Sequence, residues 1–431
     1  MKILHTVESY VPARHGMAEV VQQLSERLAA RGHQVTVATS RNPARTTNII
    51  AGVKVKDFAI RGKSALGIWG EKEAYQRYLL QCDADIVVNF AAQQWATDLA
   101  LPVLKQLRGK KIFVPTGFSA LGDPLFKGYF SAMGGHMRTY DACVFLSNSY
   151  RDIEFARSKG VEKITVIPNG ASREEFDCNA DDTFRDRFGI PKDDFLVLHV
   201  AGYLSESKGQ ADAIRIFSDS SLSNSTLMLV SPGFSRQLYD YLSPLQVAKS
   251  CYCLAKGKRM QALPFPVRLS LDKTLRQRKN SRLNRRIISH SLSRADTVSA
   301  YLAADLLLFP SWIECSPIVL FEAAASRTPF LVTDVGNSSE IISWTGSGQL
   351  LPGQPLNDAE GRTRADIAQS TMILNELYQS PDKRKTMSEK GYLAWRQYFT
   401  WEHITDRYER LYVDLLKGRS FGGSCLPPPS H

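Results

Sequence analysis

Short apolar runs alternate along the chain with longer stretches whose apolar positions recur at helical spacing. Residues Ile3–Val7 have the pattern of a short buried strand, and Ala18–Arg31 that of a helix with one apolar face. Gly32 is expected to end that helix in a left-handed conformation, and Val35–Thr39 to form the next strand. A strand–helix–strand unit of this kind requires a parallel sheet.

The same alternation continues in two series separated by the polar, acid-rich stretch Glu174–Asp182. The first series is expected to continue with strands at Ile86–Asn89, Lys111–Val114, Ala142–Leu146 and Ile164–Ile167. The second is expected to contain strands at Phe195–Val200, Leu227–Val230, Ile287–Ser289, Leu306–Phe309 and Phe330–Thr333, and a helix at Gly209–Phe217. We therefore predict an α/β chain with two parallel-sheet domains, residues 1–178 and 179–395, followed by a long, aromatic-rich helical stretch at Lys383–Leu416.

Composition restricts the class of protein. The chain has 431 residues, of which 43% are hydrophobic and 23% charged, as in globular proteins. No apolar run reaches the ~18 residues of a membrane-spanning helix, and the opening residues are too polar for a signal peptide. Seven scattered cysteines, an odd number, do not form a disulfide framework. We expect a cytoplasmic protein.

The formal charge of +11 comes almost entirely from one segment. Residues 256–286 hold one acid, Asp272, and eleven basic residues: Lys256, Lys258, Arg259, Arg268, Lys273, Arg276, Arg278, Lys279, Arg282, Arg285 and Arg286. The segment contains one aromatic residue, Phe265, and no series of rings for base stacking, so we expect no nucleic-acid partner. The segment lies within an insertion at about 234–286, with helical character at Leu269–Arg286. It is either a solvated surface or a docking site for anionic lipid at the inner face of the membrane.

Two loops follow predicted strands and open helices, where open parallel sheets bind ligands. In the loop Tyr10–Met17, Gly16 stands at a helix start, where free amides favour an anion such as a phosphate; the alternative is an ordinary turn. The loop lacks the GxGxxG pattern, which disfavours a dinucleotide-dependent dehydrogenase. In the loop Ala201–Gly209, Lys208 is placed to contact a diphosphate, although a lone lysine is more often only solvated.

A third loop carries the most information. Pro317 suits the first turn of a helix, so Glu314 is expected in the loop before that helix and Glu322 about a turn and a half inside it. The free amides of Ile318 and Val319 would then face the same cleft and bind an anion, while the carboxylates accept hydrogen bonds from sugar hydroxyls. The alternative is a capped helix with one solvated glutamate.

At these residues the chain resembles a family 4 glycosyltransferase with the GT-B fold. The resemblance covers nearly the whole length and rests on several motifs in order. They are His15–Glu19, similar to the family's Gly-Gly-x-Glu opening; Arg31–Val37; Ile164–Gly170, similar to its interdomain signature; Glu314 and Glu322, which match its Glu-x7-Glu motif; and Thr333–Gly336.

The resemblance implies two Rossmann-like domains facing across a cleft, with a C-terminal helix at 396–418 crossing back to the N-terminal domain and a disordered tail at 419–431. It implies retaining transfer of a sugar from a nucleotide diphosphate to a hydroxyl, with no metal or other cofactor. Lys208 and Glu314 would be catalytic, and the donor would also contact Gly16, Gly202, Tyr203, Ile318, Val319 and Glu322. The acceptor, a sugar or a lipid-linked molecule of polysaccharide or glycolipid assembly, would bind the first domain near Phe118–Met137.

The chain departs from the family pattern at two positions. Tyr203 stands where the family has an arginine that binds diphosphate, so either Arg14 compensates or turnover is weak. Thr116 stands where the family often has a histidine. These departures leave two alternatives open, a non-catalytic nucleotide-sugar-binding relative and a GT-B epimerase. The pair Asp83-x-Asp85 resembles a metal-binding motif but precedes its strand, on the wrong side for a site.

Overall fold

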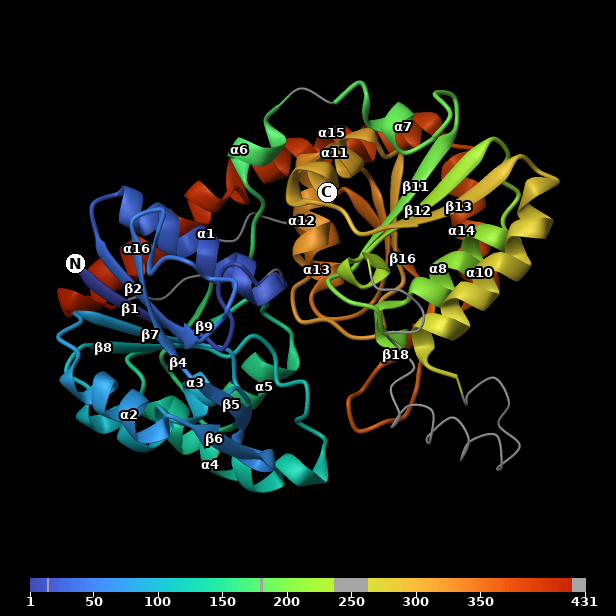
Figure 1. Ribbon diagram of the computed structural model, residues 1–431. Coiled ribbons are helices and arrows are strands. Elements are labelled where there is room, and N and C mark those ends of the chain that lie inside the picture. Colours follow the sequence, from blue (N-terminus) through green and yellow to red (C-terminus); the bar gives the residue numbers. More distant parts are fainter. Residues whose placement is uncertain (14, 179–180, 236–262, 421–431) are drawn as a thin grey trace.

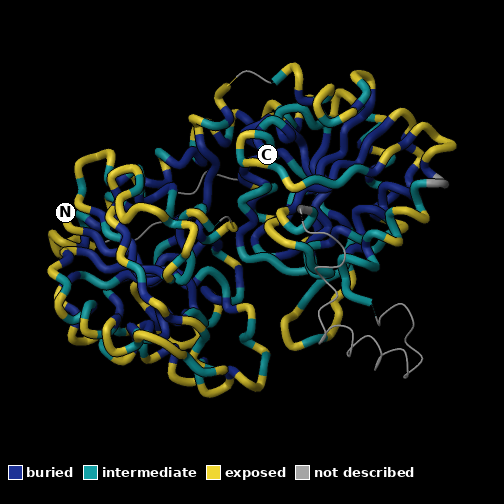
Figure 2. Tube along the Cα trace, in the orientation of Figure 1, coloured by how far each residue is buried: buried dark blue, intermediate teal, exposed yellow. Residues whose placement is uncertain are grey.

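The computed structural model describes residues 1–13, 15–178, 181–235 and 263–420, which form two α/β lobes (Figure 1). Each lobe contains a mainly parallel sheet with helices on both faces, which confirms the predicted two-domain α/β architecture. The sheets and the helix faces turned toward them are buried, and the exposed residues lie around the outside (Figure 2).

The first lobe has an eight-stranded sheet in the order β10-β9-β8-β7-β1-β2-β4-β3. All neighbours are parallel except β3, which pairs antiparallel with β4. Its strands are β1 Lys2–Thr6, β2 Gln34–Ser40, β3 Ile49–Ile50, β4 Val53–Phe58, β7 Ile86–Phe90, β8 Lys110–Val114, β9 Ala142–Phe145 and β10 Ile164–Val166. A separate antiparallel hairpin, which the hydrophobic pattern did not predict, consists of β5 Ile60–Lys63 and β6 Gly67–Gly70.

Helices of the first lobe bury both faces of this sheet. One face is covered by α2 Lys72–Gln81, α3 Trp95–Asp98, α4 Lys127–Thr139 and α5 Arg151–Ser158. The other face is covered by α1 Gly16–Ala30 and by the last helix of the chain, α16 Trp401–Leu416. Gly32 follows α1 with φ +85°, the left-handed conformation predicted for it.

The second lobe has a six-stranded, all-parallel sheet in the order β13-β12-β11-β14-β15-β16. Its strands are β11 Phe195–Val200, β12 Ser225–Val230, β13 Arg285–His290, β14 Leu306–Phe309, β15 Phe330–Thr333 and β16 Gly348–Leu351, with a hairpin of β17 Gly353–Pro355 and β18 Thr363–Ala365. Its helices are α6 Arg173–Phe176, α7 Phe184–Arg187, α8 Gln210–Asp219, α10 Phe265–Ser281, α11 Arg294–Ala303, α12 Ile318–Ala325, α13 Ser338–Thr345, α14 Ile367–Tyr378 and α15 Pro381–Tyr398. The described helices include none with the length and apolar run that a membrane crossing requires.

The predicted single helical stretch Lys383–Leu416 is wrong, because the chain breaks between α15 and α16. There it meets the linker that leaves the first lobe: Ala171 donates its N–H to Phe399 O at 3.0 Å and accepts from Trp401 N at 3.2 Å. A Cβ on Gly170 would lie 2.4 Å from Phe399 O, so the two crossing segments need a glycine here. Figure 1 shows α16, in red, lying against α1 in the first lobe.

The helix expected at Leu269–Arg286 is also shorter than predicted. α10 ends at Ser281, and β13 begins at Arg285. The reason is a tertiary contact. β13 pairs with β12 along its whole length, so Arg285 and Arg286 belong to a strand at the sheet edge and not to the helix. The tail beyond residue 420, predicted to be disordered, lies outside the described residues.

Candidate functional site

A cavity of about 450 Å³ lies between the carboxyl ends of the two sheets, and we call it the central cavity. It is lined by the start of α1, the β11–α8 loop and the β14–α12 loop. Its lining residues are His15, Gly16, Met17, Val20, Thr116, Leu146, Asn169, Val200, Ala201, Gly202, Tyr203, Lys208, Phe309, Glu314, Cys315, Ser316, Pro317, Ile318 and Val319. Seven of the eight predicted site residues therefore meet in one cavity, and the eighth, Glu322, is absent from its lining.

The first lobe contributes the start of α1. His15 is the N-cap in an extended conformation, and its side chain accepts a hydrogen bond from Ala18 N at 3.5 Å. A Cβ added to Gly16 would meet only Ile318 Cδ1 of the other lobe, at 3.7 Å. Gly16 therefore lies opposite the start of α12 with room between them. Arg14, the proposed compensating cation, lies outside the described residues.

In the second lobe, Lys208 and Glu314 bind each other. The distance between Lys208 Nζ and Glu314 Oε1 is 2.7 Å, and Ser311 Oγ donates to the same carboxylate oxygen at 2.7 Å. Burial alone would lower the pKa of Lys208, but the neighbouring Glu314 and Tyr203 outweigh it and raise that pKa, so the ammonium stays charged. Tyr203 lies with its ring centroid 5.2 Å from the same nitrogen, a cation–π contact.

A glycine positions Lys208. Gly209 follows it with φ +73° and caps the start of α8. A Cβ at this position would lie 2.0 Å from Pro310 O, in the loop after β14. The β11–α8 loop can therefore press against the β14–α12 loop only if this residue is glycine, and that contact brings Lys208 to Glu314.

The start of α12 lies at the central cavity and has no side-chain cap. Pro317 is the N-cap rather than a first-turn residue, and no side chain caps this helix. The first helical turn closes where Leu320 N donates to Pro317 O at 3.2 Å. Ile318 and Val319 therefore stand at the positive end of the helix dipole, and both line the central cavity.

Glu322 lies deeper, against a different partner. Glu322 is 4% exposed, and its carboxylate pairs with Arg294 Nη1 of α11 at 2.6 Å. Arg294 also donates to both carboxylate oxygens of Glu175, from α6, at 2.8 and 2.6 Å. Burial alone would lower the pKa of Arg294, but these two glutamates, with Glu19, raise it. Glu322 thus belongs to a buried ion-pair network, and its contact with a ribose stays a prediction.

A strained turn of the first lobe presses against the Glu314–Cys315 segment. Thr116 has φ +58°, which is rare for a β-branched residue. Gly117 follows it, and its N–H donates to Asp152 Oδ2 at 2.8 Å. A Cβ on Gly117 would lie 2.9 Å from Cys315 Cβ. The position where the family often has a histidine is therefore a tight turn at the cavity wall.

Sequence reasoning missed a polar residue that joins the two lobes at the site. The side chain of Asn169 is buried, lines the central cavity and donates to Ser316 O at 3.0 Å. Its only signal was its place within the Ile164–Gly170 motif. Because Ser316 precedes the start of α12, this bond fixes the helix start relative to the first lobe.

A second cavity of about 860 Å³, the adjoining cavity, opens beside the first. Most of its wall comes from the first lobe: the β5–β6 hairpin, residues 91–94 and residues 116–126. Four residues line both cavities: Thr116, Tyr203, Glu314 and Cys315. Ser119, Ala120, Asp123 and Phe126 come from the loop that the sequence assigned to the acceptor.

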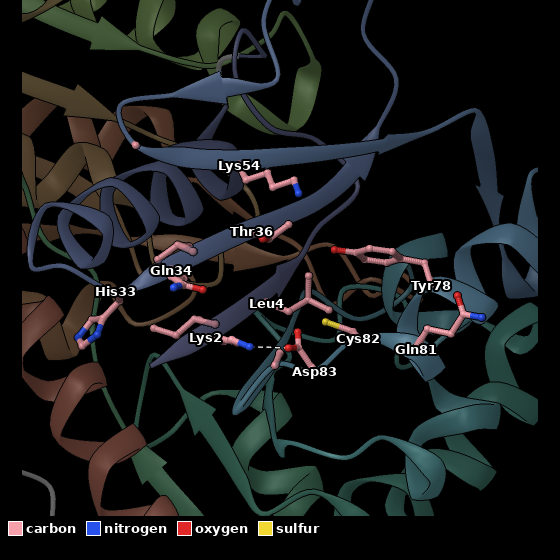
Figure 3. A pocket seen from close by; sticks show the side chains of 14 residues that line it. Lys2, Leu4, His33, Gln34, Thr36, Lys54, Tyr78, Gln81, Cys82 and Asp83 are labelled. Carbon is pink, nitrogen blue, oxygen red and sulfur yellow. Dashed lines mark hydrogen bonds and ion pairs between the residues drawn. The ribbon is translucent and has the colours of Figure 1, made fainter.

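A third cavity of about 700 Å³ lies at the opposite, amino-terminal ends of the first-lobe strands (Figure 3). Lys2 lines this cavity, and its Nζ is 2.5 Å from Asp83 Oδ2, as Figure 3 shows. The backbone Lys2 N donates to Asp85 Oδ2 at 2.7 Å, so Lys2 binds both aspartates of the Asp83-x-Asp85 pair. The described residues contain no group of three or more histidine, cysteine or acidic side chains that could hold a metal ion.

The basic segment is largely engaged in the second lobe. Arg285 is buried and donates to the carbonyls of Phe217, Ser218 and Ser220. Arg268, Lys273, Arg276 and Arg286 also bind partners within this lobe, namely Glu206, Ser289, Asp272 with Asp219, and Gly189 O. Lys256, Lys258 and Arg259 lie outside the described residues. The described part of the segment is therefore not a uniform solvent-facing patch.

Comparison with known proteins points in one direction. Residues 14–175 match the model of Glycosyltransferase Family 4, and residues 268–361 match that of Glycosyl transferases group 1. The chain is 26% identical over 287 residues to an uncharacterized glycosyltransferase of Methanocaldococcus jannaschii, covering 64% of this chain and 61% of that protein. It is 20% identical over 430 residues to the N-acetyl-alpha-D-glucosaminyl L-malate synthase of Bacillus anthracis, covering 97% and 98%.

Solved structures share the whole fold. The sucrose-phosphate synthase of Thermosynechococcus elongatus superposes with a TM-score of 0.71 at 16% identity, covering 97% of this chain and 99% of that one. The HepE protein of Anabaena, in complex with UDP and glucose, superposes with a TM-score of 0.68 at 14% identity, covering 96% and 100%.

Proposed function

The chain is a family 4 glycosyltransferase of the GT-B fold, and on that premise we propose that it transfers a sugar from a nucleotide diphosphate to a hydroxyl acceptor, with retention of configuration and without a metal ion. The observation that carries the proposal is the Lys208–Glu314 pair beside the uncapped start of α12, in a cavity between the lobes. The HepE structure with UDP and glucose supports a nucleotide-sugar donor.

The proposed chemistry is electrostatic. Negative charge grows on the departing diphosphate while positive charge develops at the sugar carbon. The α12 amides and the Lys208 ammonium would offset the first charge, and the Glu314 carboxylate would lie near the sugar. A helix N-terminus contributes about 0.3–1 kcal/mol to anion binding, and up to ~2 when partly buried. A single charge-assisted hydrogen bond contributes about 1.5–3 kcal/mol.

Lys208 supplies most of the positive charge that this mechanism requires for binding the diphosphate. Tyr203 replaces the usual arginine and supplies no positive charge. Its ring makes a cation–π contact with the Lys208 ammonium. Without a second cation among the described residues of this loop, Lys208 must bind the diphosphate largely alone. Glu322 would bind the ribose hydroxyls only while remaining paired with Arg294.

Donor binding can be tested first, with a thermal-shift screen of UDP, GDP, ADP and dTDP and their glucose forms. A ligand at 100 times its Kd stabilises the folded state by about 2.7 kcal/mol, so the preferred nucleotide should stand out. Hydrolysis of the preferred donor in water, followed as released nucleotide diphosphate, then separates an enzyme from a binding relative. Conversion of the donor sugar without its release would indicate an epimerase.

The Lys208→Met variant tests the mechanism. Loss of the ammonium should reduce donor turnover on the order of 10²–10³-fold, because no other described side chain of the β11–α8 loop replaces its charge. Lys208→Arg should retain part of the activity, and Lys192→Met, on the exposed surface of the same lobe, should retain all of it. Unchanged turnover in Lys208→Met would contradict the assignment, and loss of wild-type activity in EDTA would contradict metal independence.

We further propose a role in polysaccharide or glycolipid assembly, with peripheral contact at the cytoplasmic face of the membrane through residues 256–286. Five described cations of that segment already bind protein partners. The contact would therefore rest on the remaining basic residues. Flotation with vesicles of phosphatidylglycerol and phosphatidylcholine tests it: binding that needs the anionic lipid and falls with salt supports it, and absence from the vesicles at every salt concentration refutes it.

A further inference from the structure

The adjoining cavity has an aromatic wall that the donor machinery does not use. Trp69, in β6, lines this cavity and is 54% exposed, whereas the chain's other tryptophans are buried or half-buried. Its six-membered ring lies beside two glycines. A Cβ on Gly62 would lie 3.0 Å from Trp69 Cζ3, and a Cβ on Gly67 would lie 2.8 Å from Trp69 Cζ2.

The β5–β6 hairpin is constructed around this indole. Gly62 and Gly67 have φ values of +101° and +99°, and a Cβ on Gly62 would also lie 2.2 Å from Gly67 O. Any larger residue at either position would push the ring away from the hairpin. The indole thus packs against the backbone of the two glycines, while Trp69 lines the cavity and stays 54% exposed.

A flat aromatic surface of this kind suits a sugar ring. The axial C–H groups of a pyranose form an apolar patch with slightly positive hydrogens, and the face of an indole is electron-rich. Water is displaced from both surfaces when they stack. The contact is therefore specific for a ring with one apolar face and does not need a charged group on the ligand.

The charges of the adjoining cavity disfavour an anionic ligand. Its lining includes four carboxylates, from Glu8, Asp123, Glu314 and Glu360, against one cation, Lys63. Lys208 pairs with Glu314 and Arg362 pairs with Glu360, which leaves the carboxylates of Glu8 and Asp123. An anionic acceptor would meet these two carboxylates, whereas sugar hydroxyls can donate hydrogen bonds to them.

The two cavities share Thr116, Tyr203, Glu314 and Cys315, so a ligand on Trp69 can extend a hydroxyl toward the donor sugar. We propose that Trp69 is the stacking platform of the acceptor site and that the acceptor residue it holds is an uncharged pyranose, whose hydroxyls bind Glu8 and Asp123. The binding of an uncharged pyranose to Trp69 does not depend on the proposed function. The role of that pyranose as the acceptor does rest on it.

Binding can be measured without turnover. Trp69 is the exposed tryptophan, so acrylamide should quench mainly its fluorescence, and Trp69→Phe should remove the quenchable fraction. Maltose, cellobiose and methyl α-D-mannopyranoside serve as uncharged probes, and glucose 6-phosphate and malate as anionic ones. Protection of the quenchable fraction by at least one uncharged probe, and by neither anion, is expected. Protection by the anions alone, or by no probe, would overturn the inference whether or not the protein hydrolyses a donor.

Turnover gives the second readout. With the preferred donor, the protecting uncharged probe should accelerate release of nucleotide diphosphate above hydrolysis in water. Trp69→Ala should raise the KM for that probe about five- to tenfold, while Trp69→Phe stays close to wild type. Leu393→Ala is the control, because Leu393 is 63% exposed, belongs to α15 of the second lobe and does not line the cavity. An unaltered KM in Trp69→Ala would overturn the platform. Absence of donor hydrolysis in the wild type would refute the proposed function instead.

Discussion

Single side chains around the interlobe cavity are tuned by their neighbours in opposite ways. Lys208 is kept charged by Glu314 and Tyr203 despite its burial. Asp152, behind the Thr116–Gly117 turn, is 1% exposed, and burial raises its pKa to about 6, although amide hydrogen bonds from Gly117 and Ile153 act in the other direction. Lys208 supplies positive charge to the cavity. Asp152 supports the cavity wall, and its contribution to folding stability depends on pH.

Asp152 makes stability depend on pH between its two pKa values. The ordinary value is 3.8, so between pH 3.8 and about 6 the folded chain keeps a proton that the unfolded chain has lost. Raising the pH through this window therefore removes stability, by roughly 3 kcal/mol in total. Asp152→Asn does not titrate and still accepts from Gly117, so its Tm relative to wild type should rise from pH 4 to pH 7.

The control for this prediction is Asp334→Asn, whose side chain is exposed. Differential scanning fluorimetry across the pH range gives the comparison. The comparison uses the slope of the Tm difference against pH, because the new amide also loses the hydrogen bond from Ile153 N. A Tm difference that stays constant from pH 4 to pH 7 would show that Asp152 is already ionised in the folded chain at acidic pH.

At the scale of elements, the joint between the β11–α8 loop and the β14–α12 loop depends on Gly209. Alanine there would meet Pro310 O at 2.0 Å in addition to adopting a left-handed φ. The left-handed conformation alone costs about 1–2 kcal/mol, and Gly189→Ala isolates that cost because Gly189 has φ +66° and open space around it. Gly209→Ala should lower the Tm further than Gly189→Ala and should also weaken donor binding. Equal losses of Tm would mean that the two loops separate without cost.

The last helix, α16, is an element of the first lobe although it follows the second in sequence. Leu415 is 6% exposed and packs in the core that α16 forms with α1 and the sheet, whereas its neighbour Leu416 is 42% exposed. Leu415→Ala should cost about 2–4 kcal/mol of unfolding free energy, and the same substitution at Leu416 under about 1 kcal/mol. Urea denaturation of the two variants measures the difference, and equal midpoints would show that α16 does not stabilise the first lobe.

At the scale of the whole molecule, polar contacts hold the two lobes together beside the cavity. The Glu340 carboxylate, in the first turn of α13, accepts from Asn148 N at 3.0 Å and from Ser149 Oγ at 3.0 Å in the first lobe. Asn337 Nδ2 donates to Leu146 O at 3.0 Å, and Arg151 Nη1 donates to Glu360 O at 2.7 Å. Under the proposed function, closure of this kind would exclude water from the nucleotide-sugar donor.

Glu340→Ala should shift the molecule toward an open arrangement of the lobes. Loss of these partly exposed contacts should destabilise the closed arrangement by about 1 kcal/mol, which lowers the ratio of closed to open molecules roughly fivefold. The radius of gyration from small-angle X-ray scattering should increase, with little change in Tm. Glu360→Ala is the matched control, because its interlobe contact uses the backbone oxygen, and it should leave the radius unchanged. An identical radius in Glu340→Ala and wild type would show that other contacts suffice for closure.

The sequence determined most of the order of elements and most of the central cavity. Strand and helix periods are local, so most buried strands of the two sheets could be recognised from their own residues, although β4 and β16 were missed. The carboxyl ends of parallel strands fixed where Gly16, Lys208, Glu314, Ile318 and Val319 would gather. Short, half-exposed strands such as β5 and β6 carried no such period and were missed.

Only the tertiary structure decided contacts between residues far apart in the chain. The helix break at Phe399 follows from hydrogen bonds with Ala171, and Glu322 is bound by Arg294, and neither partner is marked by any local pattern. Trp69 likewise became a candidate site residue only when the hairpin placed its ring on two glycines at the wall of a cavity. Ion pairs, close backbone approach and exposure depend on three-dimensional distance, which hydrophobic periodicity does not encode.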